Sequence, residues 1–168
     1  PWKYWAQTSP FSIALKTPTE TLNWQQLSVR IDQYAHYLND LGVTRGDVLT
    51  LVGKNQVETL LFYLASKQLG ALAALTMVQP LDTLQSKLAT LYKPEQTRFI
   101  WFAQECASTF SEHDIQKLKA TLLSPPLVSQ QERDAVIEDA YHHDRLASVV
   151  FTSGSTGEPK AVVHTHRQ

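Results

Sequence analysis

The stretch DVLTLVGKNQVETLLFYLASKQLGALAALTM, residues 47–77, contains the pattern that decides the fold. The runs 47–53 and 71–77 are short and almost continuously apolar, which is typical of strands buried on both faces. Between them, residues 56–70 predict a helix that ends at Gly70, because glycine enters the left-handed conformation of a helix C-terminus without steric cost. A strand, a helix and a strand in this order predict a right-handed crossover between two parallel strands.

A second helix is predicted before this stretch, over residues 22–42. Asn23 can accept hydrogen bonds from the first free amides, and Gln26 can reach back to complete a capping box. Gly42 is expected to end the helix. Apolar residues recur along one face at spacings of three and four: Leu27, Ile31, Tyr34, Ala35, Leu38 and Leu41.

The alternation of strands and helices continues along most of the chain. Residues 103–145 interrupt it, because 105–123 holds at most one helix and 124–144 is polar and broken by proline, as in a surface loop. The sequence therefore predicts an α/β fold of layered βαβ units, with a mostly parallel sheet covered by helices on both faces. The remaining expected elements are strands at 11–16, 97–102 and 146–151 and a helix at 82–92.

Composition excludes several classes of function. The 168 residues carry a formal net charge of -1 without a basic cluster, which argues against a nucleic-acid partner. The longest apolar run is far shorter than the roughly 20 residues that cross a bilayer, so no membrane association is expected. The single cysteine, Cys106, cannot form an intrachain disulfide and favours a reducing, cytoplasmic compartment.

Residues 152–160, TSGSTGEPK, combine the groups that bind phosphate. Gly154 and Gly157 allow successive amide hydrogens to turn toward one centre, and Lys160 adds a positive charge. Each hydrogen bond to a charged oxygen contributes about 1.5–3 kcal/mol. The segment therefore predicts a polyphosphate cradle, to which hydroxyl groups also contribute: those of Thr152, Ser153, Ser155 and Thr156.

The phosphate loop of nucleoside triphosphatases has a different pattern. It places Lys-Ser or Lys-Thr directly after its second glycine and opens a helix. Here Glu158 and Pro159 intervene, and AVVH at 161–164 favours a strand. A plain Ser/Gly connection between two strands is the alternative, but the lysine at the exit favours phosphate binding.

TSGSTGEPK resembles the phosphate-loop signature of the adenylate-forming superfamily, which includes acyl-CoA synthetases, luciferases and peptide-synthetase adenylation domains. Thr165 and His166 match the Thr-His that commonly follows this loop, and residues 22–71 resemble the first two helices and the strand between them. Within the superfamily the chain is most similar to the o-succinylbenzoate–CoA ligases of menaquinone biosynthesis. That similarity rests on PWKYWAQ at 1–7, LNWQQL at 22–27 and Ala161 after the lysine.

The resemblance implies a two-step ligase. A carboxylate attacks the α-phosphate of ATP to give an acyl-adenylate and pyrophosphate, and the thiolate of coenzyme A then displaces AMP. Many relatives have Thr in place of Ser155 and Gly in place of Ala161, and both differences are conservative. The residues implied in phosphate binding are Thr152, Ser153, Gly154, Ser155, Thr156, Gly157 and Lys160.

The resemblance also implies that residues 1–168 are the N-terminal portion of the AMP-binding large domain, without the rest of that domain and without the C-terminal domain. In this superfamily the magnesium ligand, the adenine and acyl pockets and the lysine that promotes adenylation lie further along the chain. ATP, Mg²⁺ and coenzyme A are therefore expected as small-molecule ligands of the whole protein. No catalytic residue and no metal site are expected in this chain, which alone should be inactive. Two alternatives stay open: a ligase for another aryl or fatty carboxylate, and a non-catalytic nucleotide-binding module.

Histidines and carboxylates outside the loop are weaker candidates. His164 and His166 would share one face of a strand, but no carboxylate or thiol stands at metal-ligand spacing beside them or beside the pair at 142–143. Asp32 could be combined with Glu20 or Glu58 as a catalytic pair, but a solvated helix face explains these residues better.

The N-terminal aromatic residues Trp2, Tyr4 and Trp5 are a further candidate. They could stack on a ligand. An aromatic anchor that docks the N-terminus on the core is the better interpretation, because large aromatic side chains gain most by burial.

Overall fold

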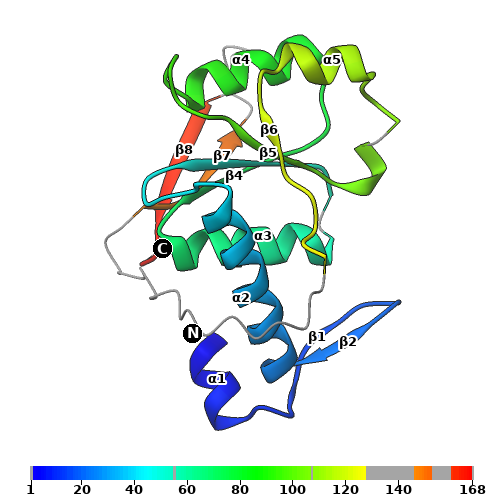
Figure 1. Cartoon of the computed structure of the whole chain (residues 1–168), viewed down its shortest axis with the longest axis vertical. Coiled ribbons are helices and arrows are strands. Elements are labelled where there is room, and N and C mark those ends of the chain that lie inside the picture. The colour runs from blue at the N-terminus through cyan, green and yellow to red at the C-terminus, as the bar shows by residue number, and fades with distance from the viewer. Residues whose placement is uncertain (1, 55, 107, 128–145, 153–159, 168) are drawn as a thin grey trace.

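The computed structural model describes residues 2–54, 56–106, 108–127, 146–152 and 160–167 (Figure 1). The helices are α1 (Trp2–Thr8), α2 (Trp24–Asp40), α3 (Val57–Leu69), α4 (Leu81–Leu91), the 3₁₀ helix η1 (Gln104–Cys106) and α5 (Glu112–Lys117). The strands are β1 (Ile13–Lys16), β2 (Thr21–Asn23), β3 (Val48–Val52), β4 (Leu72–Thr76), β5 (Phe99–Phe102), β6 (Thr121–Leu122), β7 (Leu146–Thr152) and β8 (Lys160–Thr165). Within these described ranges, no helix combines the length and the apolar character that crossing a membrane requires.

A six-stranded sheet lies at the centre of the fold, in the order β6-β5-β3-β4-β7-β8. The pairs from β6 to β7 are parallel, and β8 returns antiparallel beside β7. The strands β1 and β2 form a separate antiparallel hairpin. The predicted α/β fold of layered βαβ units with a mostly parallel sheet is confirmed.

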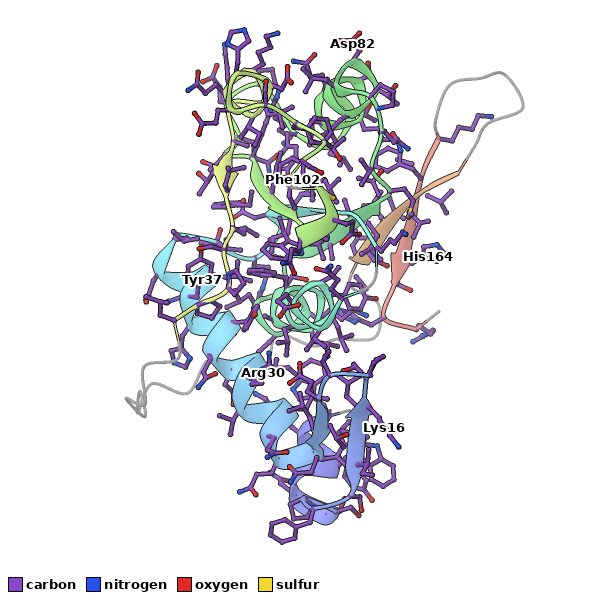
Figure 2. The ribbon with its side chains drawn as sticks, turned by 90° about the vertical axis from the view of Figure 1, so that its right-hand side faces the viewer. Lys16, Arg30, Tyr37, Asp82, Phe102 and His164 are labelled. Atoms are coloured by element: carbon purple, nitrogen blue, oxygen red, sulfur yellow. The ribbon has the colours of Figure 1, made fainter. Side chains whose placement is uncertain are left out.

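Both faces of this sheet are covered. Figures 1 and 2 show α2 and α3 on one face and α4 and α5 on the other. Side chains of β3 alternate between two cores, because successive residues of a strand point to opposite faces. Leu49 and Leu51 join the core beneath α2 and α3, and Val48 and Val52 join the core beneath α4. This double burial explains why the strand reads as a continuous apolar run.

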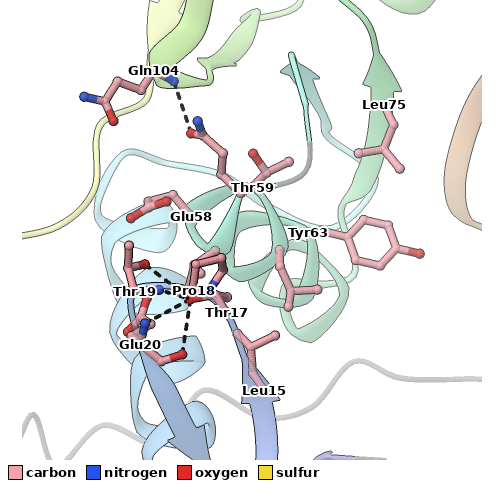
Figure 3. Close-up of a pocket in the computed structure, with 13 residues that line it drawn as sticks. Leu15, Thr17, Pro18, Thr19, Glu20, Glu58, Thr59, Tyr63, Leu75 and Gln104 are labelled. Carbon is pink, nitrogen blue, oxygen red and sulfur yellow. Dashed lines mark hydrogen bonds between the residues drawn. The ribbon is translucent and has the colours of Figure 1, made fainter.

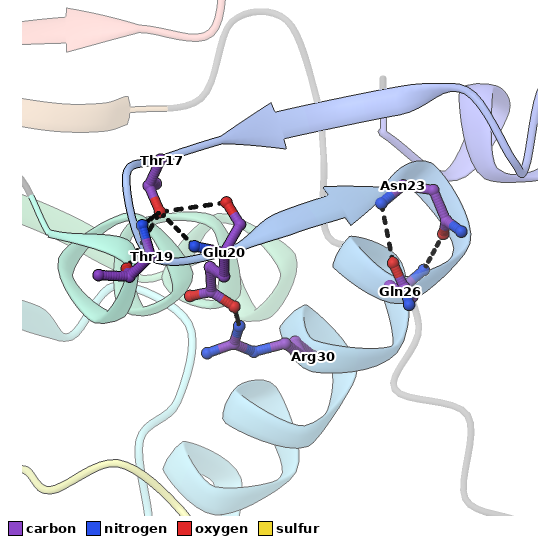
Figure 4. A network of polar contacts seen from close by, with 6 residues as sticks. All are labelled: Thr17, Thr19, Glu20, Asn23, Gln26 and Arg30. Atoms are coloured by element: carbon purple, nitrogen blue, oxygen red, sulfur yellow. Dashed lines mark hydrogen bonds and ion pairs between the residues drawn. The ribbon is translucent and has the colours of Figure 1, made fainter.

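The helix α2 begins as predicted. The Asn23 side chain accepts a hydrogen bond from the Gln26 amide at 2.8 Å, and the Gln26 side chain accepts one from the Asn23 amide at 3.0 Å (Figure 4). Leu41 is the C-cap, and Gly42 follows it with a φ of 87°. The second predicted helix stop is also confirmed, since Gly70 caps α3 in the left-handed conformation.

The N-terminal aromatic residues lie on a helix, α1, that the sequence analysis did not predict. Trp2 is buried in the core shared with α2, and the Trp5 ring stacks on Trp24 with centroids 6.2 Å apart. Tyr4 is 60% exposed and contacts only the edge of Trp5 among the aromatic rings of the described residues. The predicted anchoring of the N-terminus on the core is therefore confirmed for Trp2 and wrong for Tyr4, while Trp5 is 44% exposed and stacks on the ring of Trp24.

The weakly patterned region holds little regular structure where it is described. Its helix α5 has six residues and begins with a capping box between Ser111 and Asp114. The two-residue strand β6, which was not predicted, adds to the sheet beside β5. The predicted polar loop at 124–144 lies outside the described residues beyond position 127.

A buried tyrosine ties β3 to β5 near their amino ends. The Tyr92 hydroxyl lies 2.9 Å from the Val48 carbonyl oxygen, 3.0 Å from the Phe99 carbonyl oxygen and 3.0 Å from the Thr50 hydroxyl. Its proton can go to one carbonyl while it accepts from Thr50. Burial raises the pKa of Tyr92 to about 12, and burial likewise raises the pKa of Tyr34 to about 12.

Replacing this tyrosine should destabilise the fold. Tyr92→Phe leaves Thr50 without its buried partner, so the free energy of unfolding should fall by about 1–3 kcal/mol in urea titrations. Tyr4→Phe, at an exposed position, is the matched control and should change it by less than about 0.5 kcal/mol. Equal stability of the two variants would contradict the role given to Tyr92.

Stability should also fall at alkaline pH. Both buried tyrosines keep their protons in the folded state until about pH 12, whereas unfolded tyrosine ionises near pH 10. Their stabilisation is thus complete below pH 10 and is lost as the pH rises toward 12, by roughly 2–3 kcal/mol for each tyrosine. Urea titrations between pH 9 and pH 11.5 measure this loss, and Tyr92→Phe should reduce the slope.

Candidate functional site

The four central parallel strands end at one edge of the sheet. Their last residues are Val52, Thr76, Phe102 and Thr152. From β3 the chain crosses to β4 on one side and then to β5 on the other side, so the connections diverge at this edge. In open α/β sheets, ligands bind outside the carboxyl ends of the strands where the order reverses in this way.

The segment predicted to bind phosphate begins and ends at this edge. Thr152 is the last residue of β7, Lys160 is the first residue of β8, and the two are register partners in the antiparallel pair. The two ends of the segment are therefore held together by strand pairing. The structure brings together Thr152 and Lys160 at the backbone level, and the side chain of Lys160 is exposed. The other predicted residues lie outside the described residues: Ser153, Gly154, Ser155, Thr156 and Gly157.

Along the same edge, on the far side of β4 from β7, the loops after β3 and β5 are held together by hydrogen bonds. The Glu105 carboxylate accepts hydrogen bonds from the Lys54 amide and, at 2.7 Å, from the Gln56 side chain. The Gln56 side-chain oxygen in turn accepts from the Gln104 amide at 3.1 Å. These hydrogen bonds form a clamp between the two loops. The bond from the Lys54 amide lowers the pKa of the Glu105 carboxyl, so Glu105 is a carboxylate at neutral pH.

Gly53 permits this close approach of the two loops. It has a φ of 122°, and a Cβ atom added to it would lie 2.6 Å from the Ala103 Cβ and 2.9 Å from the Cys106 sulfur. Because both neighbours are buried, they have little space into which to move. The loops after β3 and β5 are therefore closely packed at this edge of the sheet.

A pocket of about 730 Å³ lies between the hairpin turn and α3 (Figure 3). The turn at 17–20 is fixed by the Thr17 hydroxyl, which accepts a hydrogen bond from the Glu20 amide at 3.0 Å. Glu58, Thr59 and Tyr63 line the opposite wall. Lys160 is not among the lining residues that the structure describes.

Comparison with known proteins decides the family. The AMP-binding enzyme family matches residues 2–168. The chain belongs to this family. Its match covers the phosphate segment and every described element of the fold, so the resemblance to adenylate-forming enzymes is confirmed.

Comparisons with individual proteins agree with this family assignment. A 2-succinylbenzoate–CoA ligase of Salmonella typhimurium is 34% identical over 165 residues, which is 98% of this chain and 33% of that protein. Bacitracin synthase 1 of Bacillus licheniformis is 30% identical over 157 residues, 94% of this chain and 3% of that protein. The crystallised E. coli MenE with a bound analogue of OSB-AMS is 30% identical, with a TM-score of 0.73 over 99% of this chain and 33% of that chain. The chain thus spans about a third of the length of these CoA ligases.

The weaker candidates do not form a second site in the AMP-binding chain. Glu20 pairs with Arg30 at 2.7 Å (Figure 4), and Asp32 accepts a hydrogen bond from Gln68 at 2.8 Å between α2 and α3. Asp32 is half-buried at this helix interface, so the expectation that it lies on a solvated face is wrong. His164 lies on β8, and the histidines at 142–143 are outside the described residues. The described ranges contain no group of three or more His, Cys, Asp or Glu side chains arranged to hold a metal ion.

Sequence reasoning missed the long-range contacts at the carboxyl edge of the sheet. Glu105 and Gln56 are 49 positions apart and meet only because β3 and β5 are neighbours. Lys87, on α4, is also buried, although a lysine in a helix is usually expected on the surface. Its position in the sequence could have indicated the burial, because it lies three residues after Leu84 and directly before Leu88 on the apolar side of the helix.

Gly53→Ala should test the close approach of the loops. The added methyl group meets Ala103 and Cys106, so the free energy of unfolding should fall by about 2–4 kcal/mol, measured by denaturant titration. Gly46→Ala is the matched control, because Gly46 also has a positive φ but no atom within 4 Å of an added Cβ. In Gly46→Ala the free energy of unfolding should fall by only about 1 kcal/mol. A larger loss in Gly46→Ala would refute the crowding at Gly53.

Proposed function

We propose that the protein containing this chain is an ATP-dependent acid–thiol ligase that adenylates o-succinylbenzoate and transfers the acyl group to coenzyme A, a step of menaquinone biosynthesis. Residues 1–168 then form the N-terminal portion of its AMP-binding large domain. The single cysteine supports a reducing, cytoplasmic location. The ligands are small molecules, with no role for nucleic acid or a membrane.

The observation that carries this proposal is the location of TSGSTGEPK. The segment is bounded by Thr152 and Lys160, which are paired across β7 and β8 at the carboxyl edge of the parallel sheet. This is the edge at which α/β folds bind nucleotides. The family match extends over the segment, and relatives named as 2-succinylbenzoate–CoA ligases support the choice of carboxylate.

In the proposed first step, a carboxylate oxygen of the substrate attacks the α-phosphorus of ATP, and the bond to the β-phosphate oxygen breaks. Charge develops on the departing pyrophosphate. Amide and hydroxyl donors between Thr152 and Gly157, with the Lys160 ammonium, would stabilise that charge. In the second step the coenzyme A thiolate attacks the acyl carbon and AMP leaves as the free nucleotide.

Mg²⁺ would enter with ATP and neutralise phosphate charge. We assign it no ligand in this chain, because the residues implied in phosphate binding offer hydroxyl, amide and ammonium groups, whereas Mg²⁺ prefers carboxylate oxygens and water. The acyl pocket, the adenine contacts and the catalytic lysine are proposed to lie in the part of the protein beyond these residues. The chain alone should therefore bind phosphate groups weakly and release no pyrophosphate.

Another carboxylate is the second candidate. The identity to bacitracin synthase 1, 30%, is close to the 34% identity to the Salmonella ligase, and neither comparison reaches an acyl pocket. A non-catalytic nucleotide-binding module is the third. It would bind ATP without forming AMP from any carboxylate.

Lys160→Ala should slow acyl-adenylate formation in the full-length protein by about 10²-fold, because a charge that stabilises the leaving pyrophosphate is lost. Thioester formation from supplied acyl-adenylate should change by less than about threefold, since pyrophosphate has already left. Rates of the two half-reactions give the comparison. Lys16→Ala, at an exposed position on the β1–β2 hairpin, is the control and should affect neither. Equal losses of rate in both half-reactions would indicate that Lys160 has a structural role and does not stabilise the leaving pyrophosphate.

The substrate can be tested by pyrophosphate release from the full-length protein. With o-succinylbenzoate, kcat/KM should exceed that for benzoate, a coumarate and a medium-chain fatty acid by on the order of 10²-fold or more. A preference for one of these other acids would refute o-succinylbenzoate as the substrate but would still agree with a ligase reaction. ATP binding with no AMP formed from any acid would instead favour the non-catalytic module.

A further inference from the structure

A lysine is buried on the face of α4 that packs against the sheet. Lys87 is 5% exposed, between the fully buried Leu84 and Leu88 of the same helix. Burial of an ammonium group is costly, and lysine is rarely found at such positions without a compensating partner. The surroundings of Lys87 therefore need an explanation.

Its ammonium contacts the ends of two neighbouring strands. Nζ donates a hydrogen bond to the Thr76 hydroxyl at 2.9 Å and lies 4.6 Å from the centroid of the Phe151 ring. Thr76 is the last residue of β4, and Phe151 is the last residue but one of β7. A desolvated ammonium is attracted to the negative face of an aromatic ring.

These contacts begin where backbone pairing between the two strands stops. The parallel register of β4 with β7 runs from Ala73 and Ser148 to Leu75 and Val150. Thr76 and Phe151 are the next residue on each strand. Lys87 thus joins the two strands one position beyond their last register pair, directly before Thr152 and the phosphate segment.

The charge of Lys87 has no acidic partner in the part of the chain that the structure describes. The ion pairs found there join Arg30 to Glu20 and Lys117 to Asp114. A hydroxyl and an aromatic ring orient the ammonium without neutralising it. The ammonium therefore places a positive charge beside the ends of β4 and β7, which favours an anion there.

We propose that Lys87 is a positioning residue for the phosphates of the nucleotide. It fixes the end of β7 against β4 through Phe151 and Thr76, and its charge attracts the polyphosphate to the strand end. This inference rests on the proposed nucleotide site at residues 152–160. An apolar residue of similar length would fill the same space without the cost of a buried charge, which is why packing alone does not account for a lysine.

The experiment measures ATP affinity by calorimetric titration of the full-length protein. Lys87→Met keeps the length and apolar stem of the side chain and removes its charge, and we expect the Kd for ATP to rise about tenfold. Lys87→Arg should restore the affinity to within about threefold of the parent, because it keeps the charge and the hydrogen bond. Thr76→Val should give an intermediate loss, since it removes only the hydrogen-bond acceptor.

Lys67→Met is the matched control. Lys67 also lies over an aromatic ring, that of Tyr63 at 4.3 Å, but in the last turn of α3. Its loss should leave ATP affinity unchanged. KM values give a second readout: Lys87→Met should raise the KM for ATP and leave those for the carboxylate and coenzyme A within about twofold.

The outcomes separate the two proposals. Unchanged ATP affinity in Lys87→Met, or equal rises in all three KM values, would refute the proposed role of Lys87. Either result would leave the proposed ligase activity unaffected. If the parent protein binds ATP but activates no carboxylate, the proposed ligase activity is refuted. The ATP titrations of the variants still test the role of Lys87 in that case. A parent protein that binds no ATP would overturn both. If Lys87→Met does not fold, Thr76→Val with unchanged ATP affinity would refute the positioning role.

Discussion

The parallel pairing of β3 with β4 on one side and with β5 on the other is the constraint on which the rest of the structure depends. Parallel neighbours must be joined by crossovers, so each connection carries a helix to one face of the sheet or the other. The same constraint sends the carboxyl ends of these strands to a single edge. The clamp formed by Glu105, the close approach at Gly53 and the start of the phosphate segment all lie there because of it.

Local signals in the sequence predicted a large part of this arrangement. The capping box of Asn23 and Gln26, the glycine after each of two helices and the apolar runs of β3 and β4 act over a few residues and need no tertiary partner. Elements that depend on distant contacts were missed. The helix α1 is seven residues long and is held by burial of Trp2, and β6 has two residues and exists only as an addition to β5.

The candidate site divides in the same way. Phosphate binding is predicted at 152–160 because hydroxyls, glycines and a lysine are contiguous there. The long-range contacts at the same edge of the sheet could not be predicted, since Glu105 reaches Gln56 across a strand pair and Lys87 reaches Phe151 from a helix 64 positions earlier in the chain. The structure supplies these long-range contacts, and the family match supplies the chemical context in which they can act.

The sheet also separates two apolar cores that share no side chain. The core beneath α2 and α3 contains Phe62 and Trp101, and the core beneath α4 contains Leu88 and Ile100. Only the sheet backbone lies between them. Relatives can therefore exchange core residues beneath α2 and α3 without repacking the side on which α4 meets β7. The helix layer on one side of the sheet can therefore diverge while the layer on the other side keeps its shape.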